Sequence, residues 1–178
     1  MSLGRDPLAN PEALLRRVYA YVAYRVGDRT EAEDITSETF ERALRYRSSF
    51  DARRGDPVGW LLGIARNCIY DAMLHPRLVP VETPEPADEG FEAQVVGRLT
   101  LAEALATLAD RDRDLLALRY GADLRPREIA ALLDLRTNAV EVALTRARAR
   151  LASALERAEA EPRPREGPSL ADLADPAV

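Results

Sequence analysis

Residues 124–151, LRPREIAALLDLRTNAVEVALTRARARL, contain two short helical patterns with a turn between them, and they set the fold class. Pro126 suits the first position of a helix, where its missing N–H is not needed, and apolar residues follow at helical spacing. Residues 134–136 form the predicted turn. The arrangement is that of a helix-turn-helix, whose second helix enters the major groove of DNA.

The second helix of this motif has an apolar stripe and a polar face. Val140, Leu144, Ala147 and Leu151 recur at helical spacing, and Thr137 or Asn138 is a suitable cap. Asn138 with Glu141 also imitates a capping box. The residues that we predict to contact duplex DNA are Arg136, Thr137, Asn138, Glu141, Thr145, Arg146 and Arg148. An ordinary helical hairpin with a solvated arginine flank remains the alternative.

The composition excludes several classes of protein. The chain has 178 residues with a net charge of -5 and no apolar run near the ~20 residues that a membrane span requires. One cysteine and one histidine cannot build a disulfide framework or a usual zinc site. We therefore expect a cytoplasmic protein without membrane insertion, metal or cofactor. The negative charge also disfavours strong non-specific DNA binding by itself.

Two changes in composition divide the chain. Residues 78–92, LVPVETPEPADEGFE, combine three prolines with five acidic residues and lack helical periodicity, which is typical of an extended linker. The last residues are rich in Pro, Gly and charge, which predicts disorder. We therefore expect an all-α protein of two small helical bundles, residues 8–77 and 98–158, with an acidic linker over 78–97 and a disordered tail over 159–178.

The first bundle contains three predicted helices. The first covers about residues 11–26 and ends at Gly27. A capping box of Thr30 and Glu33 opens the second, which runs to about residue 46. Asp56 caps the third, which ends before residue 75. The side chains expected to face the interior include Phe40, Ala43 and Leu44 of the second helix and Trp60, Leu61, Cys68, Ile69 and Met73 of the third.

The second bundle begins near residue 97. We predict a helix carrying three leucines (Leu101, Leu105 and Leu108), then a charged turn over residues 109–113, then a helix that stops at Gly121. The helix-turn-helix completes the bundle.

Three segments together resemble the extracytoplasmic-function group of sigma factors, in the sigma-70 superfamily. They are EAEDITSETFERAL (residues 31–44), FDARRGDPVGWLLGIARNCIYDAM (residues 50–73) and LATLADRDRDLLALRYGADLRPREIAALLDL (residues 105–135) with the helix that follows. The resemblance covers about residues 11–157. It implies a factor that binds core RNA polymerase and directs it to promoters, with the first bundle melting the minus-10 element and the second reading the minus-35 element. An anti-sigma factor is a further implied partner.

The resemblance also implies roles for individual residues. Asp34, Glu38, Glu41 and Arg42 would supply charged contacts to the polymerase, although without the rest of the family pattern a plain solvated face would be the favoured interpretation. The minus-10 candidates are Arg53, Arg54, Trp60, Arg66 and Asn67. Of these, Trp60 suits a core position better than base stacking, and Arg66 suits either a phosphate contact or an intramolecular ion pair. Glu141 stands where the family frequently carries a basic residue, so the minus-35 sequence cannot be read from this helix.

Two other classes of function were weighed. A stand-alone helix-turn-helix regulator would bind duplex operators by itself, usually as a dimer, and the acidic chain disfavours this reading. An enzyme would need a nucleophile, metal cluster or phosphate loop, and the sequence offers no such pattern. We therefore predict a protein without catalytic activity.

Overall fold

A computed structural model describes residues 6–53, 55–75 and 101–160. Every regular element in these ranges is helical. The predicted linker, the tail beyond residue 160 and the candidate Arg54 lie outside the described residues.

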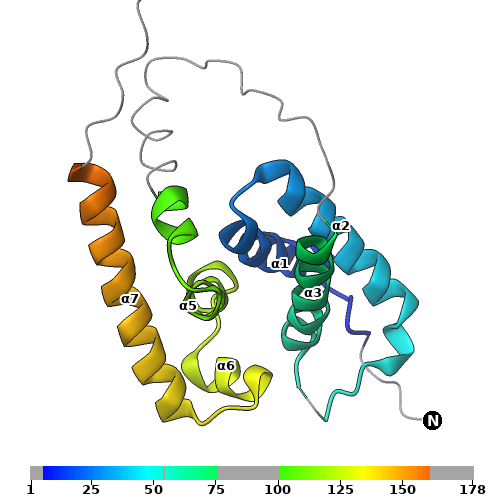
Figure 1. Cartoon of the computed structure of the whole chain (residues 1–178). Helices are drawn as coiled ribbons and strands as arrows, with labels where there is room; N and C mark the ends of the chain where they lie inside the picture. Colours follow the sequence, from blue (N-terminus) through cyan, green and yellow to red (C-terminus); the bar gives the residue numbers. More distant parts are fainter. Residues whose placement is uncertain (1–5, 54, 76–100, 161–178) are drawn as a thin grey trace, which may run out of the picture.

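The first bundle holds three helices, α1 (Pro11–Val26), α2 (Arg29–Arg45) and α3 (Pro57–Leu74), with a short 3-10 turn, η1 (Arg47–Ser49) (Figure 1). As predicted, α1 ends at Gly27, which adopts the left-handed conformation with φ of 79°. Asp56 caps α3 by accepting a 2.7 Å hydrogen bond from the Gly59 backbone N–H. The three helices pack against one another.

The second bundle contains a helical stretch at residues 101–106, α5 (Asp110–Leu116), a π-helical turn η2 (Ala117–Gly121), α6 (Pro126–Leu133) and α7 (Thr137–Ala160). Helix α7 lies along the outer side of this bundle and packs on α5 and α6 (Figure 1). The predicted helix-turn-helix therefore corresponds to α6, the turn at residues 134–136, and α7.

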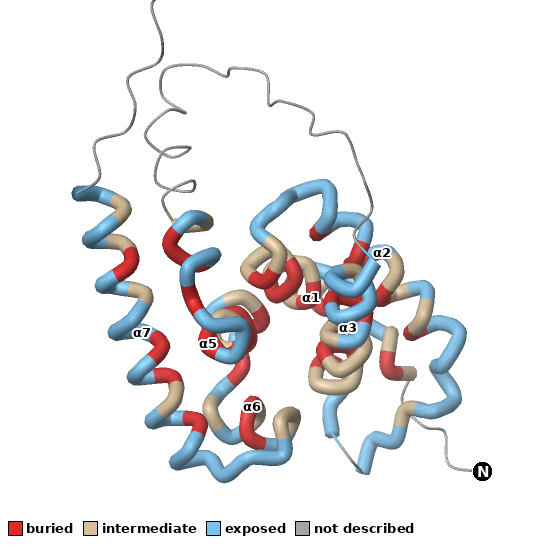
Figure 2. The backbone as a smooth tube through the Cα atoms, viewed as in Figure 1, coloured by how far each residue is buried: buried red, intermediate tan, exposed pale blue. Residues whose placement is uncertain are grey.

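The two bundles share one hydrophobic core. The same cluster of buried residues includes Val18 and Val22 of α1, Leu61 of α3, Leu118 of η2 and Val140 of α7. In Figure 2 the buried stretches of α1 and of α5 with η2 face each other across the middle of the molecule. A second, smaller cluster (Leu105, Leu108, Leu116 and Ala147) consists of buried residues of the second bundle, and Tyr24 of α1 packs against it.

Several local expectations were wrong. Asp28, and not Thr30, is the N-cap of α2, because its side chain accepts a 2.8 Å hydrogen bond from the Glu31 N–H. Leu44 and Met73, expected inside, are 61% and 57% exposed, because each lies on the outer face of its helix.

The second bundle needs similar corrections. Residues 110–113, expected as part of a charged turn, belong to α5, and the turn precedes them at residues 107–109. Asn138 lies inside α7 and makes no capping box with Glu141. Helix α7 also runs two residues into the range predicted as tail, to Ala160.

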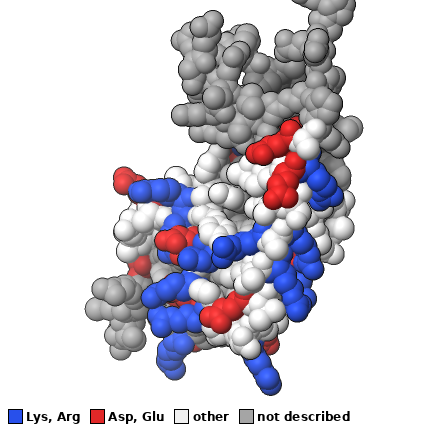
Figure 3. All heavy atoms as spheres, turned by 90° about the vertical axis from the view of Figure 1, so that its left-hand side faces the viewer, with Lys and Arg blue, Asp and Glu red and all other residues white. Residues whose placement is uncertain are grey.

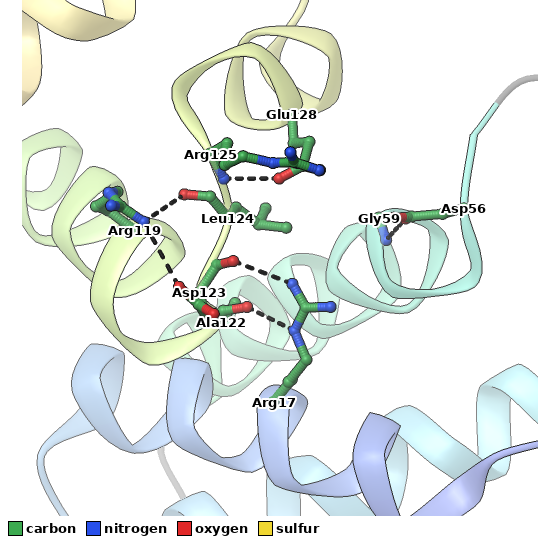
Figure 4. A network of polar contacts seen from close by, with 9 residues as sticks. All are labelled: Arg17, Asp56, Gly59, Arg119, Ala122, Asp123, Leu124, Arg125 and Glu128. Carbon is green, nitrogen blue, oxygen red and sulfur yellow. Dashed lines mark hydrogen bonds and ion pairs between the residues drawn. The ribbon is translucent and has the colours of Figure 1, made fainter.

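The bundles approach most closely where η2 meets α1. A Cβ atom at Gly121 would lie 2.8 Å from the carbonyl oxygen of Ala20 and 3.0 Å from Cα of Tyr21, so no side chain fits there without movement. Next to it, Arg17 of α1 donates hydrogen bonds to the carbonyl oxygens of Ala122 (2.7 Å) and Asp123 (3.3 Å) (Figure 4). Glycine is therefore required at 121 for close packing of the backbones.

We predict that Gly121→Ala lowers the free energy of unfolding by about 1–3 kcal/mol, because the methyl group overpacks the contact between η2 and α1. Gly63→Ala is the matched control. It lies within α3 with nothing within 4 Å of an added Cβ, so the better helix propensity should stabilise the protein by roughly 0.5–1 kcal/mol. Urea unfolding followed by circular dichroism measures both. Equal stability changes in the two variants would contradict this account.

Candidate nucleic-acid interface

The turn between α6 and α7 fixes the position of the second helix. The Arg125 backbone N–H donates a 2.7 Å hydrogen bond to Glu128 Oε2 at the start of α6, and Arg125 Nη2 donates a 2.9 Å hydrogen bond to Glu128 Oε1. The guanidinium hydrogen bond, followed by the backbone one, lowers the pKa of the Glu128 carboxyl. Asp134 ends α6 in the left-handed conformation with φ of 53°, which Asp tolerates better than most residues. The Leu135 N–H donates to the Ala130 carbonyl oxygen at 2.9 Å and closes the turn.

Helix α7 has the two faces that the sequence predicts. Val140, Leu144 and Ala147 are buried against the rest of the bundle. The predicted minus-35 set is exposed throughout, namely Arg136, Thr137, Asn138, Glu141, Thr145, Arg146 and Arg148. Basic side chains gather on the outward face of the molecule that carries α7 (Figure 3). This helix thus presents a positively charged, solvent-accessible face that suits phosphate and base-edge contacts.

One member of this set is partly engaged with its own helix. The Thr145 hydroxyl donates a 2.9 Å hydrogen bond to the Glu141 carbonyl oxygen. Its methyl group remains on the exposed face, where an apolar contact with a thymine methyl is the chemistry available to it.

The minus-10 candidates lie on α3 and the loop before it. Arg53 is exposed, and Trp60 is half-buried, with its ring edge-on to Phe50 at a centroid distance of 5.5 Å. The aromatic contact supports packing as the role of Trp60. Asn67 is exposed, and its side chain makes no hydrogen bond within the described part of the chain. Its amide is thus available to a base edge.

Tyr70 is a residue that the sequence reasoning missed. It lies one turn beyond Asn67 on α3, and it is 63% exposed. A flat, exposed side chain next to a free amide offers a stacking surface for an unpaired base. The sequence alone could have indicated Tyr70, because residues 66, 67 and 70 share one face of a helix.

Arg66 does not stand free beside Asn67, because it forms an ion pair with the second bundle. Its Nη2 lies 3.1 Å from Oδ2 of Asp114, on α5. The sequence is compatible with two roles for Arg66, a phosphate contact and an intramolecular ion pair. The structure contains the ion pair.

Asp114 is the centre of a polar cluster between the bundles, which we call the Asp114 junction: Tyr21, Arg25, Arg66, Asp110 and Asp114. The Tyr21 hydroxyl donates a 2.7 Å hydrogen bond to Asp114 Oδ1. Arg25 Nη1 lies 2.8 Å from Asp110 Oδ1, and its Nε lies 3.4 Å from Asp114. Burial raises the pKa of Tyr21 well above its usual value, and the charge of Asp114 raises it further.

The candidate polymerase residues on α2 differ in their exposure. Asp34 and Glu41 are exposed. Arg42 is half-buried and binds Glu38 at 2.6 Å and Asp71 of α3 at 2.8 Å, and these hydrogen bonds raise the pKa of its guanidinium. Arg42 and Glu38 therefore stabilise the packing of α2 on α3 in addition to any contact with a partner.

The comparisons with known proteins identify the family. The family described as sigma-70 region 2 matches residues 12–75, and the family described as sigma-70 region 4 matches residues 98–151. The chain is 33% identical over 139 residues to the extracytoplasmic-function sigma factor BldN of Streptomyces coelicolor, an alignment of 73% of this chain and 53% of BldN. The chain belongs to the extracytoplasmic-function group of sigma factors.

Other relatives agree with this family. SigC of Mycobacterium tuberculosis is 35% identical over 62% of this chain and 60% of its own length, and SigM of Bacillus subtilis is 28% identical over 75% and 85%. This sigma factor thus spans between half and two thirds of the length of BldN and SigC.

Solved structures share the fold. Sigma factor RpoE in complex with the anti-sigma factor NepR, from Bartonella quintana, matches with a TM-score of 0.62 at 22% identity, over 80% of this chain and 92% of that one. CnrH in complex with the cytosolic domain of CnrY matches with a TM-score of 0.60 at 25% identity, over 83% and 82%.

Two kinds of feature do not occur among the described residues. These residues contain no helix long and apolar enough to cross a membrane. They also contain no group of three or more His, Cys, Asp or Glu residues placed to hold a metal ion.

We predict that Tyr21→Phe lowers stability at pH 7 by about 1–3 kcal/mol, because the buried Asp114 carboxylate loses a hydrogen-bond donor. Because the pKa of Tyr21 is raised in the folded protein, the free energy of unfolding should decrease as the pH becomes alkaline. The Tyr21 hydroxyl contributes its full stabilisation below a pH of about 10, the pKa of tyrosine in the unfolded chain. This stabilisation is lost as the pH rises above that value.

Urea unfolding of the wild type and Tyr21→Phe at pH 7 and at higher pH measures both effects. The wild type should lose more stability than the variant between the two conditions. The same alkaline loss in both proteins would show that the Tyr21 hydroxyl is not the group responsible.

Proposed function

We propose that this chain is a dissociable transcription initiation factor that binds core RNA polymerase and directs it to specific promoters, without catalytic activity of its own. One observation carries the proposal, namely that one chain presents two different exposed surfaces whose side chains suit contacts with DNA. The α7 face suits duplex DNA, and the α3 face with Asn67 and Tyr70 suits unpaired bases. A stand-alone operator-binding regulator needs only the first of these surfaces.

The surfaces divide between the two promoter elements. We assign minus-35 contacts to Arg136, Thr137, Asn138, Glu141, Thr145, Arg146 and Arg148 of the second bundle. We assign minus-10 contacts to Arg53, Arg54, Arg66 and Asn67 of the first bundle, with Tyr70 as an added stacking residue and Trp60 in a packing role. Asp34, Glu38, Glu41 and Arg42 are the assigned polymerase contacts. The bundle limits remain those of the sequence prediction, residues 8–77 and 98–158.

We also propose an anti-sigma factor as a partner. The support is that two structurally similar proteins, the sigma factor RpoE of Bartonella quintana and CnrH, were solved with other proteins bound, and the partner of RpoE is described as an anti-sigma factor.

Run-off transcription on a genomic library with core RNA polymerase tests the main proposal and recovers the promoters. Specific transcripts that depend on this protein are expected. Failure to bind core polymerase, combined with tight duplex binding by the protein alone, would favour the operator-binding regulator.

On a recovered promoter, we predict that Arg146→Gln and Arg148→Gln each weaken holoenzyme binding and each reduce the slope of log affinity against log salt by about 1, if each arginine neutralises a phosphate. Arg157→Gln is the matched control. It is exposed on the same helix, toward its other end, and its Nε donates to the Ser153 carbonyl oxygen. An equal change of slope in Arg157→Gln would mean that net charge, and not the assigned face, sets the salt dependence.

For the minus-10 element, we predict that Asn67→Ala lowers the fraction of melted promoter about tenfold, equivalent to about 1.4 kcal/mol, because a base edge loses its amide partner. Permanganate reactivity of unpaired thymines measures melting. Asn10→Ala is the control, since Asn10 is also exposed and its side chain makes no capping bond to α1. Unchanged melting in Asn67→Ala would remove Asn67 from the interface.

A further inference from the structure

The centre of the exposed face of α7 consists of uncharged side chains. Asn138, Val142 and Thr145 follow one another at helical spacing on the side of the helix opposite Val140 and Ala147, which are buried. The first turns of the second helix are the part of a helix-turn-helix that meets base edges. The side chains along this centre, and not only the arginines beside it, therefore determine which bases fit.

Val142 is an apolar residue that the fold leaves in contact with solvent, since it is 43% exposed. Among the base edges of the major groove, the apolar group is the 5-methyl group of thymine. Packing a valine methyl group on this thymine methyl group removes apolar surface of both from water. A thymine is therefore the base that this part of α7 favours.

Glu141 differs from its neighbours in charge. It is exposed, and its carboxylate makes no hydrogen bond or ion pair within the described part of the chain. A carboxylate only accepts hydrogen bonds, so it repels phosphates and the acceptor atoms of guanine. Adenine presents its N6 donor next to the N7 acceptor, whereas cytosine presents the N4 donor alone. Cytosine is therefore the base edge that matches Glu141.

The negative charge at this position reverses the preference that a basic residue would have. A guanidinium in place of the Glu141 carboxylate would donate to O6 and N7 of guanine. The amino-acid sequence of α7 leaves the minus-35 element open, and the exposure of Glu141 and Val142 narrows it to two base pairs of stated chemistry.

We propose that Glu141 and Val142 are specificity-determining residues for duplex DNA. Glu141 accepts a hydrogen bond from the N4 amino group of a cytosine, and Val142 packs on the methyl group of a thymine in a neighbouring base pair. Arg146 and Arg148 lie on either side of this central face, where they reach phosphates. The place of this duplex at the minus-35 element rests on the function proposed above, whereas the reading of the two bases does not require the polymerase.

The first measurement is the sequence preference for a duplex library with a randomised segment. The full-length chain, alone at low salt and in complex with core polymerase, selects from this library, because low salt strengthens duplex binding by an acidic protein. The selected sequences should share a C·G pair next to a T·A pair. Glu141→Gln should change the preference from cytosine to adenine, which glutamine reads through N6 and N7, by about tenfold in the ratio of affinities.

Glu156→Gln is the matched control for charge. Glu156 is exposed on the same helix toward its other end, so this variant removes the same negative charge. It should strengthen binding to all sequences alike and leave the ratio of affinities for two sequences unchanged. A Glu141→Gln variant that keeps the preference of the wild type would overturn the role of Glu141.

Val142 is tested at the level of one methyl group. Deoxyuridine in place of the thymine removes only the 5-methyl group, so the wild type should bind about threefold to fivefold more weakly, as expected for one buried methyl group. Val142→Ala should bind both duplexes equally. Circular dichroism establishes that each variant is folded. A wild type that does not distinguish the two duplexes would overturn the thymine contact.

Thr145→Ser is the comparison variant for Val142→Ala. It loses a methyl group from the same face and keeps the hydroxyl that donates to the Glu141 carbonyl oxygen at 2.9 Å. This variant should still distinguish thymine from deoxyuridine. Loss of the distinction in Thr145→Ser and not in Val142→Ala would overturn the assignment to Val142.

The outcomes separate the base reading from the proposed function. If the two base pairs are read as described but the chain supports no promoter-dependent transcription with core polymerase, the proposed function fails and the base reading stands. Promoter-dependent transcripts from elements that respond to neither Glu141→Gln nor Val142→Ala would keep the proposed function and overturn the base reading. Selection of no sequence, by the chain or by its complex with polymerase, would overturn both.

Discussion

The contact between the bundles depends on the buried carboxylate of Asp114. Isolated from water, this negative charge would cost several kcal/mol, and it is tolerated because Tyr21, Arg25 and Arg66 surround it. All three partners come from the first bundle, whereas Asp114 is on α5. Within the described structure, the side-chain partners of the Asp114 carboxylate therefore come only from the first bundle. This polar contact fixes which faces of the two bundles meet.

Apolar packing and the absence of a side chain at Gly121 then allow the two bundles to lie close together. Tyr21 is fully buried and joins the core with its ring while its hydroxyl reaches Asp114. The missing side chain at Gly121 lets η2 approach α1, and Arg17 satisfies two carbonyl oxygens beside it. These contacts lie on neighbouring parts of α1, so we expect their contributions to stability to be non-additive.

The sequence predicted those features whose signals are local. The ends of α1 and α3 were read from Gly27 and Asp56, and α6 from Pro126. The start of α2 was misjudged because Asp28 and Thr30 are both good caps and only the fold selects between them. The sequence predicts residues 109–113 as a charged turn, because nothing in that stretch indicates that Asp112 is buried with Arg150 of a distant segment as its partner.

The contact between bundles could not be predicted in this way, because its members are far apart in the chain. Tyr21 and Asp114 are separated by 93 positions, and no local periodicity connects them. The same separation explains why the role of Arg66 remained open at the level of sequence.

The two candidate DNA surfaces differ in what their arginines contact within the chain. Arg146 and Arg148 of α7 are exposed, whereas Arg66 of α3 is paired with Asp114 of the second bundle. A phosphate contact by Arg66 would therefore exchange one charged partner for another. Such an exchange is nearly balanced in electrostatic terms, so contacts other than the one at Arg66 have to decide it.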